Sequence, residues 1–235
     1  ITEGLVGSEM CIRDSPKDIT EDECEFDYPS EVFMRSYNPN IEINESALDI
    51  AVDKILKSHK PVIYAGGGVI NSNASKNLTD LVKYLNFPVT NTLMGLGCYP
   101  GDDPQFLQML GMHGSYEANM AMHDCDLLIA VGARFDDRIT GRLDKFSPEA
   151  TVIHIDVDPS SISKNIKAHI PIVGDVKGVI EKISNRIVDK KLKPQNVDKW
   201  WDEINEWRKK DSFKYTQGDD VIKPQFVIDR LYDIT

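Results

Sequence analysis

The residues best suited to chemistry lie between Leu110 and Gly141, in the order LGMHGSYEANMAMHDCDLLIAVGARFDDRITG. The segment opens with a Gly-Met-His-Gly loop around His113, and glycine lets a backbone approach a ligand closely. Further on, the apolar run 127–131 is typical of a buried strand and is followed by Gly132. Open α/β sheets bind ligands at the carboxyl ends of their strands, so the charged sequence after Gly132 is placed for a ligand site.

Two arginines and two aspartates in that charged sequence permit two interpretations. Arg134 and Arg138 can each offer a planar, bidentate cation to a pyrophosphate. Asp136 and Asp137 can orient these arginines toward a ligand, or they can neutralise them in an ordinary surface loop. Spacing alone favours the two interpretations equally.

Other strand ends supply weaker candidates. The triple glycine 66–68 follows an apolar run, but it fits neither the G-x-G-x-x-G fingerprint nor a P-loop, and turn geometry alone explains it. Asp156 ends another apolar run, at the position where dinucleotide-binding folds place an acidic residue against a ribose hydroxyl. Leu93 and Met94 could be core residues, and Asp175 could be a solvent-exposed turn residue.

Neither a metal site nor a disulfide framework is predicted. His113 stands alone, without a second histidine or cysteine at metal-ligand spacing. The four cysteines, Cys11, Cys24, Cys98 and Cys125, have no paired or C-x-x-C spacing. Scattered thiols fit a reducing compartment, so we expect a cytoplasmic protein.

The composition limits the partners. Of the 235 residues, 41% are hydrophobic, which is enough to build a core, and the formal net charge of −11 opposes binding to nucleic acid or anionic membranes. No apolar run approaches the roughly 20 residues of a membrane span. We therefore expect a protein that binds small molecules, with no nucleic acid and no membrane among its partners.

Strand and helix patterns alternate along the chain. Strands are predicted near 60–68, 87–93, 126–131, 151–157 and 170–174, and helices from 44 and at 71–86, 116–123, 160–165 and 176–188. This alternation implies parallel pairing with right-handed crossovers. The predicted fold is α/β, a doubly wound parallel sheet of five or six strands spanning residues 40–188.

The flanks have a different composition. Residues 16–39 are polar and acidic and are predicted to be a linker, and 189–223 form a second linker that contains a helix. In that helix Trp200, Trp201, Ile204 and Trp207 share one face, which favours packing on the protein itself over stacking on nucleotides. Pro224 suits the first position of a last helix, 224–235.

Six motifs resemble one enzyme family, in the family's order and at its spacing. The similarity runs from about Pro16 to the last residue and is to the catalytic subunit of acetohydroxyacid synthase (acetolactate synthase), a thiamine diphosphate enzyme. The motifs are Tyr64-Ala-Gly-Gly-Gly68, Thr92-Leu-Met-Gly-Leu-Gly97, the Gly-Met-His-Gly loop, Arg134-Phe-Asp-Asp-Arg138, His154-Ile-Asp-Val-Asp-Pro159 and Ile172-Val-Gly-Asp175.

The resemblance implies that residues 40–188 are a central FAD-binding domain. It places Thr92, Leu93 and Met94 beside the flavin, and Asp156 and Asp175 on the adenosine half. It also puts Arg138 near the mouth of the substrate channel. The implied cofactor-binding residues are Gly67, Gly68, Thr92, Leu93, Met94, His113, Gly114, Gly132, Arg134, Asp136, Arg138, Asp156 and Asp175.

In that family thiamine diphosphate attacks pyruvate, CO₂ leaves, and the resulting carbanion condenses with a second 2-oxo acid in branched-chain amino acid synthesis. FAD does no net redox work there. The resemblance further implies a homo-oligomer, possible association with a regulatory small subunit, and Mg²⁺ with thiamine diphosphate in other domains. The family's activating glutamate and its Gly-Asp-Gly…Asn motif are expected upstream of Pro16 and beyond Thr235, so no catalytic residue is assigned. We expect a fragment that lacks synthase activity by itself, with 224–235 beginning the thiamine diphosphate domain.

Residues 1–15 depart from the family's pattern. They replace an expected strand of the type Gly-Arg-Pro-Gly-Pro-Val and resemble translated sequencing-adapter read-through, so we expect them to be non-native. Three alternatives to the synthase stay open from sequence. They are another FAD-containing thiamine carboligase such as glyoxylate carboligase, an NAD-dependent oxidoreductase with an unusual Rossmann domain, and a non-catalytic nucleotide-binding module.

Overall fold

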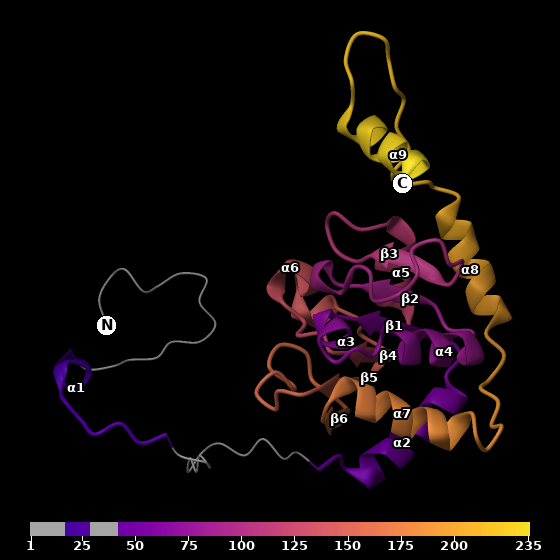
Figure 1. Cartoon of the computed structure of the whole chain (residues 1–235). Coiled ribbons are helices and arrows are strands. Elements are labelled where there is room, and N and C mark those ends of the chain that lie inside the picture. Colours follow the sequence, from indigo (N-terminus) through magenta and orange to yellow (C-terminus); the bar gives the residue numbers. More distant parts are fainter. Residues whose placement is uncertain (1–16, 29–41) are drawn as a thin grey trace. The chain divides into compact units, whose positions relative to one another are not determined.

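A computed structural model describes residues 17–28 and 42–235, and the chain divides into two units, Ile1–Pro39 and Asn40–Thr235 (Figure 1). In the first unit the described residues contain helix α1 (Lys17–Glu21). The predicted non-native segment 1–15 lies outside the described residues, and so does half of the predicted linker, residues 16 and 29–39.

The second unit is built on a six-stranded sheet whose neighbouring strands all pair in parallel, in the order β3-β2-β1-β4-β5-β6. This order is that of a doubly wound fold, so the predicted fold class is confirmed. The one strand that the sequence patterns did not predict is β3. The strands are β1 (Pro61–Ala65), β2 (Val89–Asn91), β3 (Phe106–Met109), β4 (Leu127–Val131), β5 (Thr151–Asp156) and β6 (Ile170–Val173).

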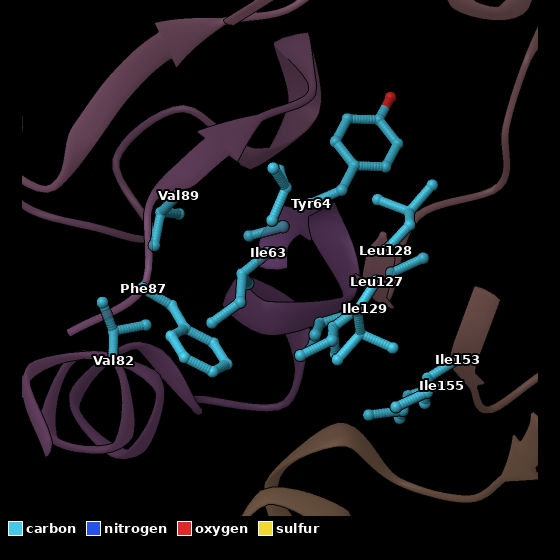
Figure 2. Packing of buried hydrophobic residues seen from close by; sticks show 14 of the residues in the cluster. Ile63, Tyr64, Val82, Phe87, Val89, Leu127, Leu128, Ile129, Ile153 and Ile155 are labelled. Carbon is cyan, nitrogen blue, oxygen red and sulfur yellow. The ribbon is translucent and has the colours of Figure 1, made fainter. Parts of the chain in front are cut away.

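The central strands β1 and β4 are buried along their whole length, as expected for a parallel sheet covered on both faces. Successive residues point to opposite faces, and Figure 2 shows Tyr64 and Leu128 on one side of the sheet and Phe87 and Val82 on the other. The two faces together form one continuous hydrophobic core.

Helices flank the sheet (Figure 1). The predicted start of the first of them is confirmed, because the Asn44 side chain accepts a hydrogen bond from the Ala47 amide at 3.1 Å. The helices of this unit are α2 (Glu45–Lys57), α3 (Gly67–Asn71), α4 (Ser75–Leu85), η1 (Leu93–Gly95), α5 (Tyr116–Asp124), α6 (Asp137–Thr140), η2 (Leu143–Lys145), α7 (Val176–Ile187), α8 (Asp198–Arg208) and α9 (Pro224–Ile234).

Two predicted helices differ from the structure. The helix predicted over 71–86 is α4, which begins only at Ser75 because residues 72–74 form a turn in which Asn73 has a left-handed backbone. The short helix α3 lies before this turn, starting in the predicted glycine loop, and was not predicted. The helix predicted over 160–165 is wrong. The Asp158 carboxylate accepts hydrogen bonds from Ser160 and Ser161, and Ser163 is left-handed, so side-chain bonding holds this segment in turns.

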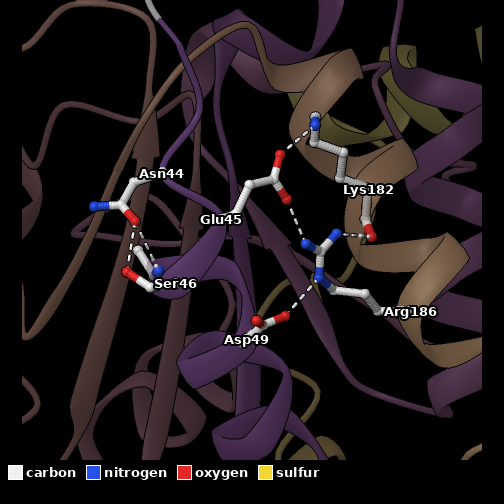
Figure 3. A network of polar contacts seen from close by, with 7 residues as sticks. Asn44, Glu45, Ser46, Asp49, Lys182 and Arg186 are labelled. Carbon is white, nitrogen blue, oxygen red and sulfur yellow. Dashed lines mark hydrogen bonds and ion pairs between the residues drawn. The ribbon is translucent and has the colours of Figure 1, made fainter.

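A polar network joins α2 to α7 (Figure 3). Glu45 pairs with Lys182 at 2.5 Å and with Arg186, whose Nε also donates to Asp49 at 2.8 Å. Hydrogen bonds from Lys182 and then from Arg186 lower the pKa of the Glu45 carboxyl. The two carboxylates are exposed and the two cations are partly buried, so each of these pairs contributes little to the stability of the fold.

Helix α8 packs on the protein itself, as its apolar face predicts. Trp200 is buried and donates from Nε1 to the Pro61 carbonyl at 3.0 Å, at the start of β1. Trp201 donates to the Asn86 carbonyl at 2.9 Å. After α7 the chain therefore returns to the amino ends of β1 and β2, and α8 also contacts α5.

Candidate functional site

The candidate site lies at the carboxyl edge of the sheet, where the strand order reverses. The chain moves outward from β1 to β2 and β3 on one side, and from β4 to β5 and β6 on the other. The loops after β1 and β4 therefore begin side by side at the point where ligands usually bind in folds of this type. All thirteen predicted cofactor-binding residues follow or end strands at this one edge.

Glycines 66, 68 and 132 let the β1 and β4 loops touch. The Gly66 and Gly68 amides donate to the Val131 and Gly132 carbonyls at 2.9 and 3.1 Å. A Cβ on Gly66 would lie 2.8 Å from the Ala133 Cα, and one on Gly132, where φ is +59°, would lie 2.6 Å from the Gly68 Cα. Backbone contact between the two loops thus requires these glycines whether or not a ligand is bound.

The loop after β2 presents an apolar surface. The Thr92 amide donates to the Ala65 carbonyl, and its hydroxyl accepts from the Gly95 amide, both at 2.9 Å, which holds η1 beside β1. Leu93 and Met94 are 67% and 74% exposed, so the interpretation of these residues as core is wrong. Met94 lies against Gly67, where a Cβ would approach the Met94 Cβ at 3.2 Å.

The Gly-Met-His-Gly loop is held from behind by Asn119, a residue that the sequence patterns did not single out. Its side chain accepts from the Gly111 amide at 3.1 Å and donates to the Gly111 carbonyl at 3.0 Å. Gly111 has φ +103°, and a Cβ there would lie 2.9 Å from Ile139 Cδ1 in α6. His113 is exposed at the tip of the loop, which therefore lies beside the arginine segment.

In the arginine segment the side chains alternate in direction. Phe135 is buried, with an unusual left-handed backbone (φ +55°), while Arg134 and Asp136 are exposed and pair with each other at 3.0 Å. Within residues 42–235, no carboxylate lies within ion-pairing distance of the exposed Arg138 guanidinium. The Arg134–Asp136 pair fits both interpretations of this segment, since a pairing carboxylate can also orient the guanidinium toward a ligand.

Asp156 and Asp175 both serve local structure. Asp156 is nearly buried, and its carboxylate accepts from the Asp158 amide at 2.9 Å. Asp175 is exposed and caps α7 by accepting from the Gly178 amide at 3.1 Å. The Gly174 amide donates to the Asp156 carbonyl at 3.0 Å, so the ends of β5 and β6 bring the two acidic residues to neighbouring positions.

The described residues contain neither a cluster of metal ligands nor a membrane-spanning helix. No group of three or more His, Cys, Asp or Glu side chains among them is arranged to hold a metal ion. None of the helices in residues 17–28 and 42–235 has the length and apolar character needed to cross a membrane.

Comparison with known proteins identifies relatives over nearly the whole chain. The family model described as "Thiamine pyrophosphate enzyme, central domain" matches residues 48–183. The acetolactate synthase large subunit of Haemophilus influenzae is 45% identical over 95% of this chain and 40% of its own length. Acetolactate synthase isozyme 3 large subunit of Escherichia coli is 44% identical over 95% and 40%, and acetolactate synthase of Mycobacterium leprae is 41% identical over 94% and 36%. The chain thus spans about two fifths of the length of these relatives.

Proposed function

Because this chain belongs to the thiamine pyrophosphate enzyme family through its central domain, we propose that it is the FAD-binding part of an acetolactate synthase large subunit. The observation that carries the proposal is the convergence of the six family motifs on one sheet edge, at the reversal of the strand order. Similarity to acetolactate synthases over about 95% of the chain supports the choice of enzyme.

The side chains at this edge fit the parts of FAD. Leu93 and Met94 are exposed next to each other and offer an apolar surface to a flat ring system. Adjacent exposed apolar side chains are typical of a binding surface. Arg134 and Arg138 offer planar cations to the pyrophosphate. Asp156, at the end of β5, is placed to accept hydrogen bonds from ribose.

The remaining proposed contacts complete this arrangement. Asp136 orients the Arg134 guanidinium, and Asp175 lies beside Asp156 on the adenosine side. His113 and Gly114 approach from the loop after β3, with Gly67, Gly68, Gly132 and Thr92 forming the floor between the strands. When bound, FAD supplies a planar, redox-capable isoalloxazine ring, whereas these residues supply orientation, charge and exclusion of water.

For the whole protein we propose condensation of two 2-oxo acids, with loss of CO₂ from pyruvate, on thiamine diphosphate and Mg²⁺. Those cofactors would bind outside this chain's segment. A homo-oligomer, a regulatory small subunit and a cytoplasmic location belong to the same proposal. The free thiols of Cys24, Cys98 and Cys125 are consistent with that compartment.

The test is a flavin titration of the 235-residue chain. We expect the flavin fluorescence to change when FAD binds. We also expect FAD to raise the melting temperature of the chain, with no comparable effect of NAD⁺. Arg134→Ala should weaken FAD binding about tenfold, the effect of one charged hydrogen-bonding group. Arg142→Ala is the control, because Arg142 forms a similar exposed pair with Asp144, two residues along the chain, and should leave binding unchanged. Absence of FAD binding, or equal losses in the two variants, would contradict the proposed site.

A further inference from the structure

A buried aromatic group lies directly behind the exposed Arg134. Register places Tyr64, Ala130 and His154 side by side across β1, β4 and β5, on the same face of the sheet. The small Ala130 in the middle leaves space above β4. Phe135 fills this space, with its ring centroid 5.7 Å from that of Tyr64 and 5.0 Å from that of His154.

His154 is fully buried and bonds the backbone beside Arg134. Its Nε2 lies 2.8 Å from the Ala133 carbonyl oxygen, and a carbonyl can only accept, so Nε2 carries the proton. Burial lowers the pKa of the imidazole, which is therefore neutral. Nδ1 is buried and has no hydrogen-bond partner among the described residues. A histidine that costs the fold an unsatisfied nitrogen is more than a space-filling core residue, for which leucine would suffice.

A second side chain bonds the backbone on the other side of Arg134. Asn165, in the turns after β5, donates from Nδ2 to the Phe135 carbonyl at 2.7 Å. The backbone carbonyls of residues 133 and 135 thus both bond to side chains, one from β5 itself and one from the turns that follow it. Arg134 is the residue between them, and Phe135 holds the left-handed conformation that turns Arg134 and Asp136 to the same exposed side.

We propose that His154 and Asn165 are positioning residues, which hold the backbone on both sides of Arg134 so that its guanidinium faces the ligand crevice. The inference rests on the proposed function, because it assigns to these residues a share in binding the pyrophosphate. The loop is then ordered during folding, so its ordering costs no free energy when the ligand binds, and the affinity for the ligand is higher. Neither residue touches the ligand in this proposal.

The first test changes the donor at position 154. His154→Leu removes the donor and keeps an apolar side chain of similar size, whereas His154→Gln keeps an amide N–H that can reach the Ala133 carbonyl. We expect FAD affinity to fall about tenfold in His154→Leu and to recover to within about threefold of wild type in His154→Gln. Equal affinity in the Leu variant and wild type would overturn the proposal.

The second test asks whether the effect passes through Arg134. In an Arg134→Ala background, His154→Leu should cause no further loss of affinity, because the guanidinium to be positioned is absent. Asn165→Ala, a change of an exposed residue that leaves the core intact, should show the same coupling. A full additive loss in the double variant would assign His154 to a different role.

A second histidine, His169, precedes strand β6 and serves as a control. His169 accepts a hydrogen bond from the Val152 amide at 3.0 Å, near the start of β5 and away from the carboxyl edge. His169→Leu should lower the melting temperature without changing FAD affinity. If it weakens FAD binding as much as His154→Leu does, the loss reflects general destabilisation and the proposal fails.

The positioning bond can also be observed without any ligand. Nitrogen-15 spectra of the histidine rings should show His154 at pH 7 as the neutral tautomer with a slowly exchanging proton on Nε2. A ring protonated on Nδ1, or one whose Nε2 proton exchanges rapidly, would overturn the inference even where FAD binds. Conversely, absence of FAD binding by wild type with this tautomer intact would refute the proposed function and leave the positioning bond established.

Discussion

Gly66→Ala tests the contact between the β1 and β4 loops with little interference from backbone strain. The Gly66 backbone is extended (φ −112°, ψ −175°), a conformation that alanine adopts readily. Its new Cβ would lie 2.8 Å from the Ala133 Cα and closer still to the Gly132 carbonyl oxygen. These neighbours are backbone atoms, which cannot rotate away as a flexible side chain can.

The loops must therefore separate, by about 0.6 Å for the Ala133 contact alone to reach an ordinary distance. Separation strains or breaks the two hydrogen bonds that Gly66 and Gly68 donate across the gap. A buried group that loses its partner costs about 1–3 kcal/mol, so two such bonds predict a loss of about 2–6 kcal/mol. That is a large share of the roughly 5–15 kcal/mol by which a domain is stable.

The assay is urea unfolding, followed by far-UV circular dichroism and by fluorescence of the tryptophans in α8, including the buried Trp200. We expect the midpoint to fall with little change in slope. Gly101→Ala is the control, because Gly101 is exposed and a Cβ there meets nothing within 4 Å. It should change stability by no more than about 1 kcal/mol, in the stabilising direction. If the two variants differ by less than about 0.5 kcal/mol, the loops are not in the tight contact described.

Three further predictions concern pH, thiol reactivity and activity. Burial lowers the pKa of His154 below 6.5, so unfolding at lower pH is accompanied by proton uptake, and stability should fall as pH drops below 6.5. The His154→Gln variant should lack this component, which amounts to about 1.4 kcal/mol per pH unit, and an unchanged pH dependence in urea unfolding would contradict it. Burial raises the pKa of Cys98 to about 11 and of Cys125 to about 12, so iodoacetamide at pH 8 should label the exposed Cys24 and neither buried thiol, as peptide mass spectrometry would show. The 235-residue chain given pyruvate, thiamine diphosphate and Mg²⁺ should form no acetolactate, because its sequence contains no Gly-Asp-Gly motif, and measured product would refute this expectation.

Local sequence patterns were sufficient to predict those elements whose structure depends on a single segment of the chain. Asn44 caps α2, and Val176 begins α7 one residue after its Asp175 cap, as the spacing of apolar and polar residues predicts. The failure at 160–165 is also local, since serine and aspartate side chains compete with the helix for backbone hydrogen bonds. Strand β3 was missed because its sequence Phe-Leu-Gln-Met contains no β-branched residue, and its pairing with β2 is interrupted by a register shift beside the left-handed Gln108.

Sequence by itself determined the alternation of strands and helices, the parallel fold that follows from it, and the family motifs that point to one sheet edge. It could not decide which loops touch, because that depends on the order of strands in the sheet, with β1 beside β4. Only the tertiary structure showed that Gly66 and Gly132 are needed for contact between backbones. It also showed that the Asn119 and His154 side chains hold two loops at the carboxyl edge of the sheet by hydrogen bonds to their backbone. Such contacts join residues far apart in the chain, so they cannot be predicted from the spacing of residues within one segment.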